Sequence, residues 1–230
     1  MAISIDTVYQ KVLALANKEQ RGYITPQEFN LFAEQAQLEI FEQYFYDLNQ
    51  YLRVHNNNEE YSDIIHNLNE KISLFEKETT VTGSGTIRTI QVISNKFWRL
   101  GTVYVGSTEL EEVQQNEILT MYRSKLTEPS YKFPVYVRKS EIAIDVYPSG
   151  LSALKCTYVA KPQKPIWGYV VINSRAMYDA TNTTNFELHM AEESELIYKI
   201  LKIAGLSMQR DDLSRGGQGL ESMQVQQEKQ

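Results

Sequence analysis

The chain has 230 residues, of which 42% are hydrophobic, and a formal net charge of −6 from 29 acidic and 23 basic residues. This balance argues against a protein that grips nucleic acid, which requires clustered Lys and Arg. The single cysteine, Cys156, excludes an internal disulfide. The amino terminus lacks the basic region of a signal peptide, and no apolar run approaches the roughly 20 residues of a membrane span. We therefore expect a soluble protein that is cytoplasmic at synthesis and has no membrane partner.

Two helices are predicted at the start of the chain, and the second, from Thr25 to Val54, is the longest. Thr25 can cap it, Pro26 suits its first position, and Glu28 completes a capping box. Its apolar residues form two nearly opposite faces. One face holds Phe29, Phe32, Ala33, Ala36, Ile40, Tyr44 and Tyr51, and the other holds Leu31, Leu38, Phe41, Phe45, Leu48 and Leu52. Two faces need two partners, so another subunit is expected beside the chain's own helical bundle, with Leu38, Phe41, Phe45 and Leu48 as subunit-interface candidates.

The loop that joins these two helices resembles a calcium-binding EF-hand loop at residues 17–28. Its first ligand position holds Asn17 instead of Asp, and its fifth holds Arg21, whose charge would oppose a bound Ca²⁺. We therefore predict an ordinary glycine turn, with no metal and no cofactor.

A third helix with an apolar stripe from Tyr61 to Phe75 completes an expected helical bundle over residues 1–78. Residues 79–188 then read as a β-rich lobe, because β-branched and aromatic runs alternate with Gly, Pro, Asn and Ser. One hairpin is predicted to turn at residues 139–141, and a short helix at residues 113–123. Trp98 and Trp167 are expected to anchor the core of this lobe, and Cys156 to be a small core residue.

Helix returns at Met190 and is predicted to stop at Gly205, and the segment 189–207 is expected to dock back on the bundle. Residues 208–230 form a polar, glutamine-rich tail that cannot build a core of its own. The predicted fold is α+β: an N-terminal antiparallel helical bundle completed by a C-terminal helix, with a central β-rich lobe.

Patterns typical of catalysis are missing from the sequence. It contains no phosphate-binding glycine loop, no nucleophile elbow, no H-E-x-x-H and no C-x-x-C. Its histidines, His55, His66 and His189, are far apart in the chain. We therefore expect no catalytic residues and no enzyme, and an unrecognised hydrolase with its site in the β lobe is the disfavoured alternative.

Three stretches together resemble the head-to-tail connector proteins of short-tailed bacteriophages, which include tail tubular protein A and the ring proteins of crAss-like phages. They are the opening IDTVYQKVLALANKEQRGYITPQEFNLFAEQAQLEIFEQYFYDLNQY, the central SKLTEPSYKFPVYVRKSEIAIDVYPSG followed by YVAKPQKPIWGYV, and the end NFELHMAEESELIYKILKIAGLSMQRDD. The likeness spans nearly the whole chain and lies in its layout, not in a catalytic motif.

The resemblance implies a virion protein at the head-to-tail junction, a homo-oligomeric ring typically of twelve copies. Its implied partners are other copies of the chain, the portal protein, and tail nozzle or tail-fibre proteins, with genomic DNA passing through without specific binding. We expect Glu34, Glu39 and Glu42 to face the channel, where acidic surface would let DNA slide. In the tail, Arg210, Asp212, Arg215 and Leu220 are the portal-contact candidates. The alternative is a minor virion or cargo protein, or a soluble protein-binding module.

Overall fold

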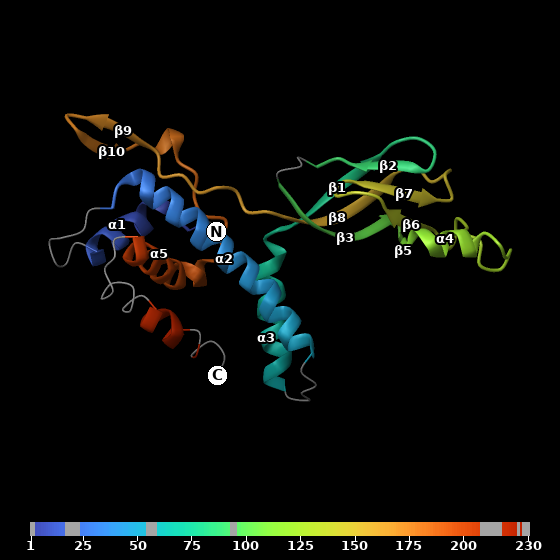
Figure 1. Cartoon of the computed structure of the whole chain (residues 1–230), viewed down its shortest axis with the longest axis horizontal. Coiled ribbons are helices and arrows are strands. Elements are labelled where there is room, and N and C mark those ends of the chain that lie inside the picture. The colour runs from blue at the N-terminus through green and yellow to red at the C-terminus, as the bar shows by residue number, and fades with distance from the viewer. Residues whose placement is uncertain are drawn as a thin grey trace. The chain divides into compact units, whose positions relative to one another are not determined.

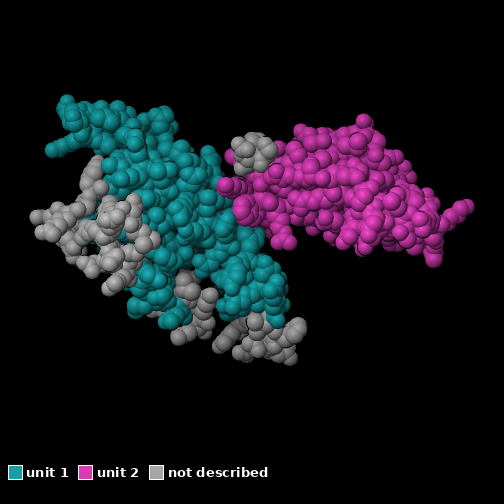
Figure 2. All heavy atoms as spheres, viewed as in Figure 1, with its two compact units in different colours: residues 1–74, 162–230 teal, residues 75–161 magenta. Residues whose placement is uncertain are grey.

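The computed structural model describes residues 3–16, 24–53, 59–92, 96–207, 218–224 and 226. It confirms a mixed α+β protein. The chain divides into two compact units, unit 1 formed by Met1–Leu74 with Pro162–Gln230, and unit 2 formed by Phe75–Lys161 (Figures 1 and 2). The expected lobe boundaries, residues 79 and 188, therefore differ from the observed ones, and residues 162–188 lie with the helices.

Helices dominate unit 1. They are α1 (Ile5–Ala16), α2 (Pro26–Arg53), α3 (Glu59–Ser73) and α5 (Glu193–Ser207), which follows the 3-10 turn η4 (Met190–Glu192). The predicted capping box of α2 is confirmed: the Glu28 amide donates to Thr25 Oγ1 at 3.3 Å, and the Thr25 amide donates to Glu28 Oε2 at 3.0 Å. Helix α5 packs against α1 and α2, and α3 packs against α2. The predicted stop at Gly205 is wrong, because α5 continues to Ser207. The loop compared with an EF-hand lies mostly outside the described residues, which resume at Ile24.

Two amide side chains of α2 hold residues 162–188 against the helices of unit 1. Asn30 Oδ1 accepts from the Trp167 amide at 2.8 Å, and Asn30 Nδ2 donates to the Trp167 carbonyl at 3.3 Å. Further along the same helix, the buried Gln37 donates to the Gln163 carbonyl at 2.8 Å and accepts from the Glu187 amide at 3.1 Å. This segment contains the hairpin of β9 (Tyr169–Ile172) and β10 (Arg175–Tyr178) and the turn η3 (Ala180–Asn182). Its strand-like composition explains why sequence patterns assign it to the β lobe.

Unit 2 is one strongly curved sheet of eight strands. In chain order they are β1 (Glu76–Thr82), β2 (Ile87–Ile90), β3 (Phe97–Val105), β4 (Thr108–Glu109), β5 (Glu111–Glu112), β6 (Val135–Arg138), β7 (Ala143–Tyr147) and β8 (Leu154–Ala160), with α4 (Gln115–Met121) between β5 and β6. Their order across the sheet is β4-β3-β8-β1-β2-β7-β6-β5. The two edge strands are neighbours in sequence, joined through the buried Leu110, so the sheet curls until it is nearly closed. Ile144, Val146 and Cys156 are among its fully buried core residues.

Several strand predictions can now be checked. Antiparallel pairing of β6 with β7 confirms the hairpin, with Ile144 and Val146 on its buried face. Strand β1 was not predicted, because EKETTVT follows directly on a helical stripe and looks like its polar end. The expectation for the two tryptophans is wrong in part: Trp98 is 41% exposed, and Trp167 is buried in unit 1, not in the β lobe.

Arg88 on β2 fastens the loops at one end of the sheet. Its side chain is 8% exposed and donates to the carbonyls of Ser149 at 3.0 Å and Leu151 at 2.7 Å, and to that of Gly83. Gly83 has a φ of +143°, and a Cβ there would lie 2.5 Å from the Ile87 carbonyl. The Arg88 guanidinium supplies the hydrogen bonds that water would otherwise donate to these three carbonyl groups.

Arg88→Met should destabilise unit 2 by about 3 kcal/mol, because it leaves those carbonyls without a charged donor. Urea unfolding followed by Trp98 fluorescence, in a Trp167→Phe background, measures the change in unit 2. Arg99→Met, at an exposed arginine of β3, is the matched control and should change stability by less than about 0.5 kcal/mol. Equal losses for the two variants would contradict the role assigned to Arg88.

Candidate interaction surfaces

The exposed side of α2 carries a row of apolar residues that we call the outer stripe: Leu31, Leu38, Phe45 and Leu52, each seven residues after the last. Leu31 is 60% and Leu52 58% exposed, and Leu38 and Phe45 are half-buried. Tyr46, 68% exposed, lies beside them. A seven-residue repeat keeps such side chains on one side of a helix and is typical of helices that pack against a partner. The opposite side of α2, with Phe29, Ala33, Ala36 and Ile40, is fully buried in unit 1.

The four subunit-interface candidates do not behave alike. Leu38, Phe45 and Leu48 keep part of their surface exposed, so the single chain does not bury them fully. Phe41 has no exposed surface, and its ring packs edge-on against Phe45 with centroids 5.1 Å apart. It lies on the border of the buried side of α2 and cannot contact another subunit, which corrects the expectation for this residue. Phe41 instead packs against Phe45 from the buried side of α2.

The predicted channel-facing acids accompany the outer stripe. Glu34 forms an ion pair with Lys164 at 2.6 Å, Glu39 accepts from Gln35 Nε2 at 3.0 Å, and Glu42 is exposed. Spacing on the helix places Glu34 and Glu42 next to the stripe and Glu39 at its flank, toward α5. The exposed side of α2 is therefore both apolar and acidic.

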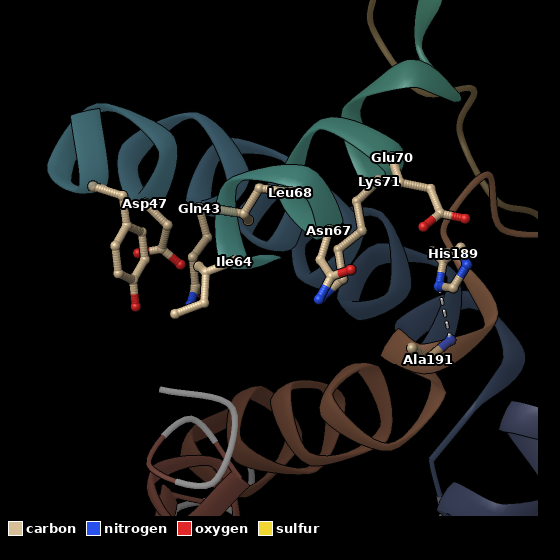
Figure 3. A pocket seen from close by; sticks show the side chains of 10 residues that line it. Gln43, Asp47, Ile64, Asn67, Leu68, Glu70, Lys71, His189 and Ala191 are labelled. Atoms are coloured by element: carbon tan, nitrogen blue, oxygen red, sulfur yellow. Dashed lines mark hydrogen bonds between the residues drawn. The ribbon is translucent and has the colours of Figure 1, made fainter. Parts of the chain in front are cut away.

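A cavity of about 350 Å³ opens between α2, α3 and the turn η4 (Figure 3). Its lining mixes amides, carboxylates and aliphatic groups: Gln43, Asp47, Tyr51, Ile64, Asn67, Leu68, Glu70, Lys71, His189 and Ala191. His189 caps η4, since its Nδ1 accepts from the Ala191 amide at 3.3 Å. Lys71 pairs with the buried Glu192 at 2.5 Å and lies over the Tyr44 ring, 5.7 Å from its centre. These contacts give both residues structural roles: His189 caps η4, and Lys71 joins α3 to η4.

Groups suited to metal or thiol chemistry are scarce in the part of the chain that the structure describes. Among those residues, no three His, Cys, Asp or Glu side chains gather where they could hold a metal ion. Burial raises the pKa of the Cys156 thiol to about 11, so it stays protonated and unreactive at neutral pH. Burial and the nearby Glu112 carboxylate raise the pKa of Tyr136, whose hydroxyl donates to Glu112 at 3.1 Å. Within the same residues, no helix is long and apolar enough to cross a membrane.

Part of the C-terminal tail is ordered against α5. Residues 218–224 form a helical turn whose Glu221 pairs with Lys199 at 2.7 Å and with Lys202 at 2.9 Å. Lys199 is 5% exposed and also pairs with Glu195 at 3.4 Å. Of the portal-contact candidates, Leu220 is 44% exposed, while Arg210, Asp212 and Arg215 lie outside the described residues.

This contact should depend on pH through Glu221. Burial alone would raise the pKa of this carboxyl, but hydrogen bonds from Lys199 and Lys202 outweigh it and lower the pKa. A lowered folded-state pKa means that the stabilisation is complete above the ordinary Glu value of about 4.3 and is lost as pH falls through the lower folded value.

Glu221→Gln mimics the protonated group at neutral pH and should weaken docking of residues 218–224 by about 2 kcal/mol, since both lysines lose their anionic acceptor. Hydrogen exchange of the amides in this segment should then be faster by roughly thirtyfold. Glu128→Gln, at an exposed carboxylate of unit 2, provides the control. Unchanged exchange of residues 218–224 in the Glu221→Gln variant would show that the ion pairs do not hold the segment.

The β9–β10 hairpin is a second exposed apolar surface. Figure 1 shows it extending beyond the helices of unit 1. Val170, Val171, Ile172 and Met177 are each at least half exposed, at 50%, 63%, 53% and 55%. Two-stranded hairpins are marginally stable by themselves, and this one stands on Trp167, whose ring packs against Tyr169 and Tyr178 with centroids 5.9 and 5.8 Å apart. The hairpin is therefore held at its base while its apolar side chains face outward.

Comparison with known proteins adds no relative: neither a model of a known protein family nor a curated protein matches the sequence.

Proposed function

We propose that this chain is a non-catalytic virion protein that forms a ring at the head-to-tail junction of a short-tailed bacteriophage, where it joins the portal to the tail and surrounds the DNA passage. The outer stripe of α2 carries the proposal. Leu31 and Leu52 expose more than half of their surface on an otherwise well-packed helix, and exposed apolar rows of this kind mark interaction sites. A ring of identical subunits supplies a partner for such a row in every copy.

The parts of the chain receive the following roles in this proposal. The helices of unit 1 act as an antiparallel bundle, completed by α5, that contacts neighbouring copies through the outer stripe. Unit 2 contacts tail nozzle or tail-fibre proteins. The C-terminal segment lies toward the portal, with the 44% exposed Leu220 as a contact residue. The protein is thus made in the host cytoplasm and ends in the virion.

Electron microscopy of particles from the phage that encodes this chain tests the proposal. Antibody fragments against the chain should label the tail axis between portal and nozzle, and a reconstruction should show the chain as a closed ring there. Purified chain, mixed with the portal protein and sized by light scattering, should bind as multiple copies. Labelling inside the head or away from the tail axis would overturn the proposal.

The acids beside the outer stripe supply a separate prediction about DNA. If they line the passage, Glu34→Lys, Glu39→Lys and Glu42→Lys together should slow genome ejection, because lysines bind phosphates that carboxylates repel. Ejection triggered in vitro and followed with a DNA-binding dye measures the rate. Lys substitution at Glu141, an exposed acid of unit 2, is the control. Normal ejection by particles that contain the triple variant would remove these residues from the channel wall, and failure of the variant chain to enter particles would place them in a contact between copies instead.

One observation favours a different function. The β9–β10 hairpin exposes apolar side chains and pairs its strands only with each other among the described residues. A strand from a ligand could add to such an edge, as expected for a protein-binding module or a minor virion or cargo protein. A monomeric chain that binds a peptide or protein at this hairpin, and is found away from the tail axis, would favour this alternative.

A further inference from the structure

One end of unit 2 carries a segment rich in exposed apolar and basic side chains, which we call the tip (residues 119–133). Figure 1 shows α4 and the loop after it at one end of the sheet. Leu126 is 94%, Phe133 69% and Tyr131 67% exposed. These are larger exposures than those of any residue in the outer stripe, and they fall on three side chains of one loop. Single exposed hydrophobic residues are ordinary, whereas a group of this size indicates an interaction site.

The backbone of the tip is fixed by its own hydrogen bonds. Thr127 Oγ1 donates to the Met121 carbonyl at 2.9 Å, and the Glu128 amide donates to the Ser124 carbonyl at 3.0 Å. The Phe133 amide donates to the Ser130 carbonyl at 3.1 Å. The exposed side chains are therefore presented from a preformed loop, which lowers the entropy lost on binding.

The charge of the tip is opposite to that of the protein. It contains three basic residues, Arg123, Lys125 and Lys132, against one acidic residue, Glu128, in a chain whose net charge is −6. None of the ion pairs among the described residues involves these three cations. Lys132 lies over the Phe133 ring, 5.5 Å from its centre, so apolar and cationic groups share one surface.

The outer stripe of α2 has the complementary character. It presents Leu31, Leu38 and Phe45 next to Glu42 and next to Glu34, which is already paired with Lys164, with Glu39 at its flank. The tip instead presents Leu126, Tyr131 and Phe133 among cations. We infer that the tip of one copy docks on the outer stripe of α2 in the next copy, which places the acids of α2 in the contact between copies and not on the wall of the DNA passage. Apolar contact supplies affinity, and the opposite charges select this pairing over tip against tip or stripe against stripe.

This inference rests on the proposed function and gives it a specific interface. A contact between two different surfaces of the same chain is heterologous, so each copy has one donor and one acceptor surface and successive copies can close into a ring. A nucleic acid would need only the cations of the tip, and a lipid surface would use the tip alone, whereas a second copy accounts for both the tip and the outer stripe. The pairing should weaken in high salt, because exposed charges are screened within about 10 Å at an ionic strength of 0.1 M.

Cysteine cross-linking between two variants tests the inference in the full chain. Cys156, the single native cysteine, is buried, so introduced thiols are the reactive ones. Leu126→Cys protein is mixed at high concentration with a variant carrying Leu31→Cys, Gln35→Cys or Leu38→Cys and is oxidised. A disulfide-linked dimer of the two variants should form with at least tenfold higher yield than with Val171→Cys, an exposed position on the β9–β10 hairpin.

Charge reversal supplies the second measurement. R123E, K125E and K132E together should reduce the cross-linking yield by at least tenfold, and E34K, E39K and E42K on the other variant should restore it. Cross-linking no better than the Val171 control at all three α2 positions would overturn the inference. If rings are seen on the tail axis but cross-linking is no better than the control, the proposed function stands and only this inference fails. If cross-linking is specific but no rings are seen, only the proposed function fails.

Discussion

Leu31→Lys and Leu52→Lys together should abolish ring assembly while leaving the folded chain intact. Both side chains are mostly exposed in the single chain, at 60% and 58%, so the substitutions should change folding stability by less than about 0.5 kcal/mol each. In an interface the same leucines would each contribute about 1.5–3 kcal/mol of apolar burial, and a lysine would bring an unpaired charge instead. We expect association to weaken by at least about a hundredfold.

Assembly on the portal protein, sized by light scattering, measures this effect, and thermal unfolding by circular dichroism checks that the fold is retained. The matched control is Leu15→Lys, which changes a leucine of α1 that is 43% exposed but lies off the outer stripe. Rings that assemble normally from the double variant would show that α2 does not contact its neighbours through this row.

Trp167→Ala should have the largest effect on unit 1, with a loss of about 3–5 kcal/mol in the free energy of unfolding. Trp167 is 5% exposed, and its ring centroid lies 4.5 Å from that of Tyr9. Its Nε1 donates to Asp6 Oδ1 at 2.9 Å. Removal of the indole leaves a cavity between α1 and the hairpin base and takes the indole donor away from the Asp6 carboxylate. The hairpin β9–β10 should lose its support at the same time.

Urea unfolding gives the loss of stability, and hydrogen exchange in residues 169–178 reports separately on the hairpin. Trp98→Ala is the comparison, because Trp98 is 41% exposed on β3 and its truncation should cost less than about 1.5 kcal/mol. Similar losses for the two variants, or a hairpin that keeps its protection in Trp167→Ala, would contradict the supporting role of Trp167.

Local patterns predicted the local parts of the fold. The Thr25–Glu28 capping box, the hairpin of β6 and β7 and the buried Cys156 all follow from residues close in sequence, where propensity and periodicity act directly. The same patterns placed residues 162–188 in the wrong unit. What decides that placement is a set of hydrogen bonds that join the Asn30 and Gln37 side chains to backbone groups 126 to 150 residues away, and helical periodicity carries no signal for them.

The exposed surfaces proposed for interaction were also predicted only in part from the sequence. The helical wheel separated the two faces of α2 and placed Leu31 and Leu52 on the one that remains exposed. It placed Phe41 on that same face, which is wrong, because Phe41 lies between the two faces and is buried by tertiary contacts. The tip of unit 2 was missed, because exposed residues in a loop have no period, and the only signal was a local excess of Lys and Arg among aromatic residues.

The pairing of β1 with β8 has a consequence for the evolution and engineering of this protein. These antiparallel strands bring the two ends of unit 2 together: Glu76 lies opposite Val159, and the Ala160 amide donates to the Phe75 carbonyl at 2.8 Å. Unit 2 is thus an insertion that leaves the helical chain and returns to it at nearly one point. A cassette of this kind can be exchanged for another domain, or removed and replaced by a short linker, without altering the path of the helices. Relatives that share the helical part could therefore carry quite different domains at this position, each adapted to its own neighbour.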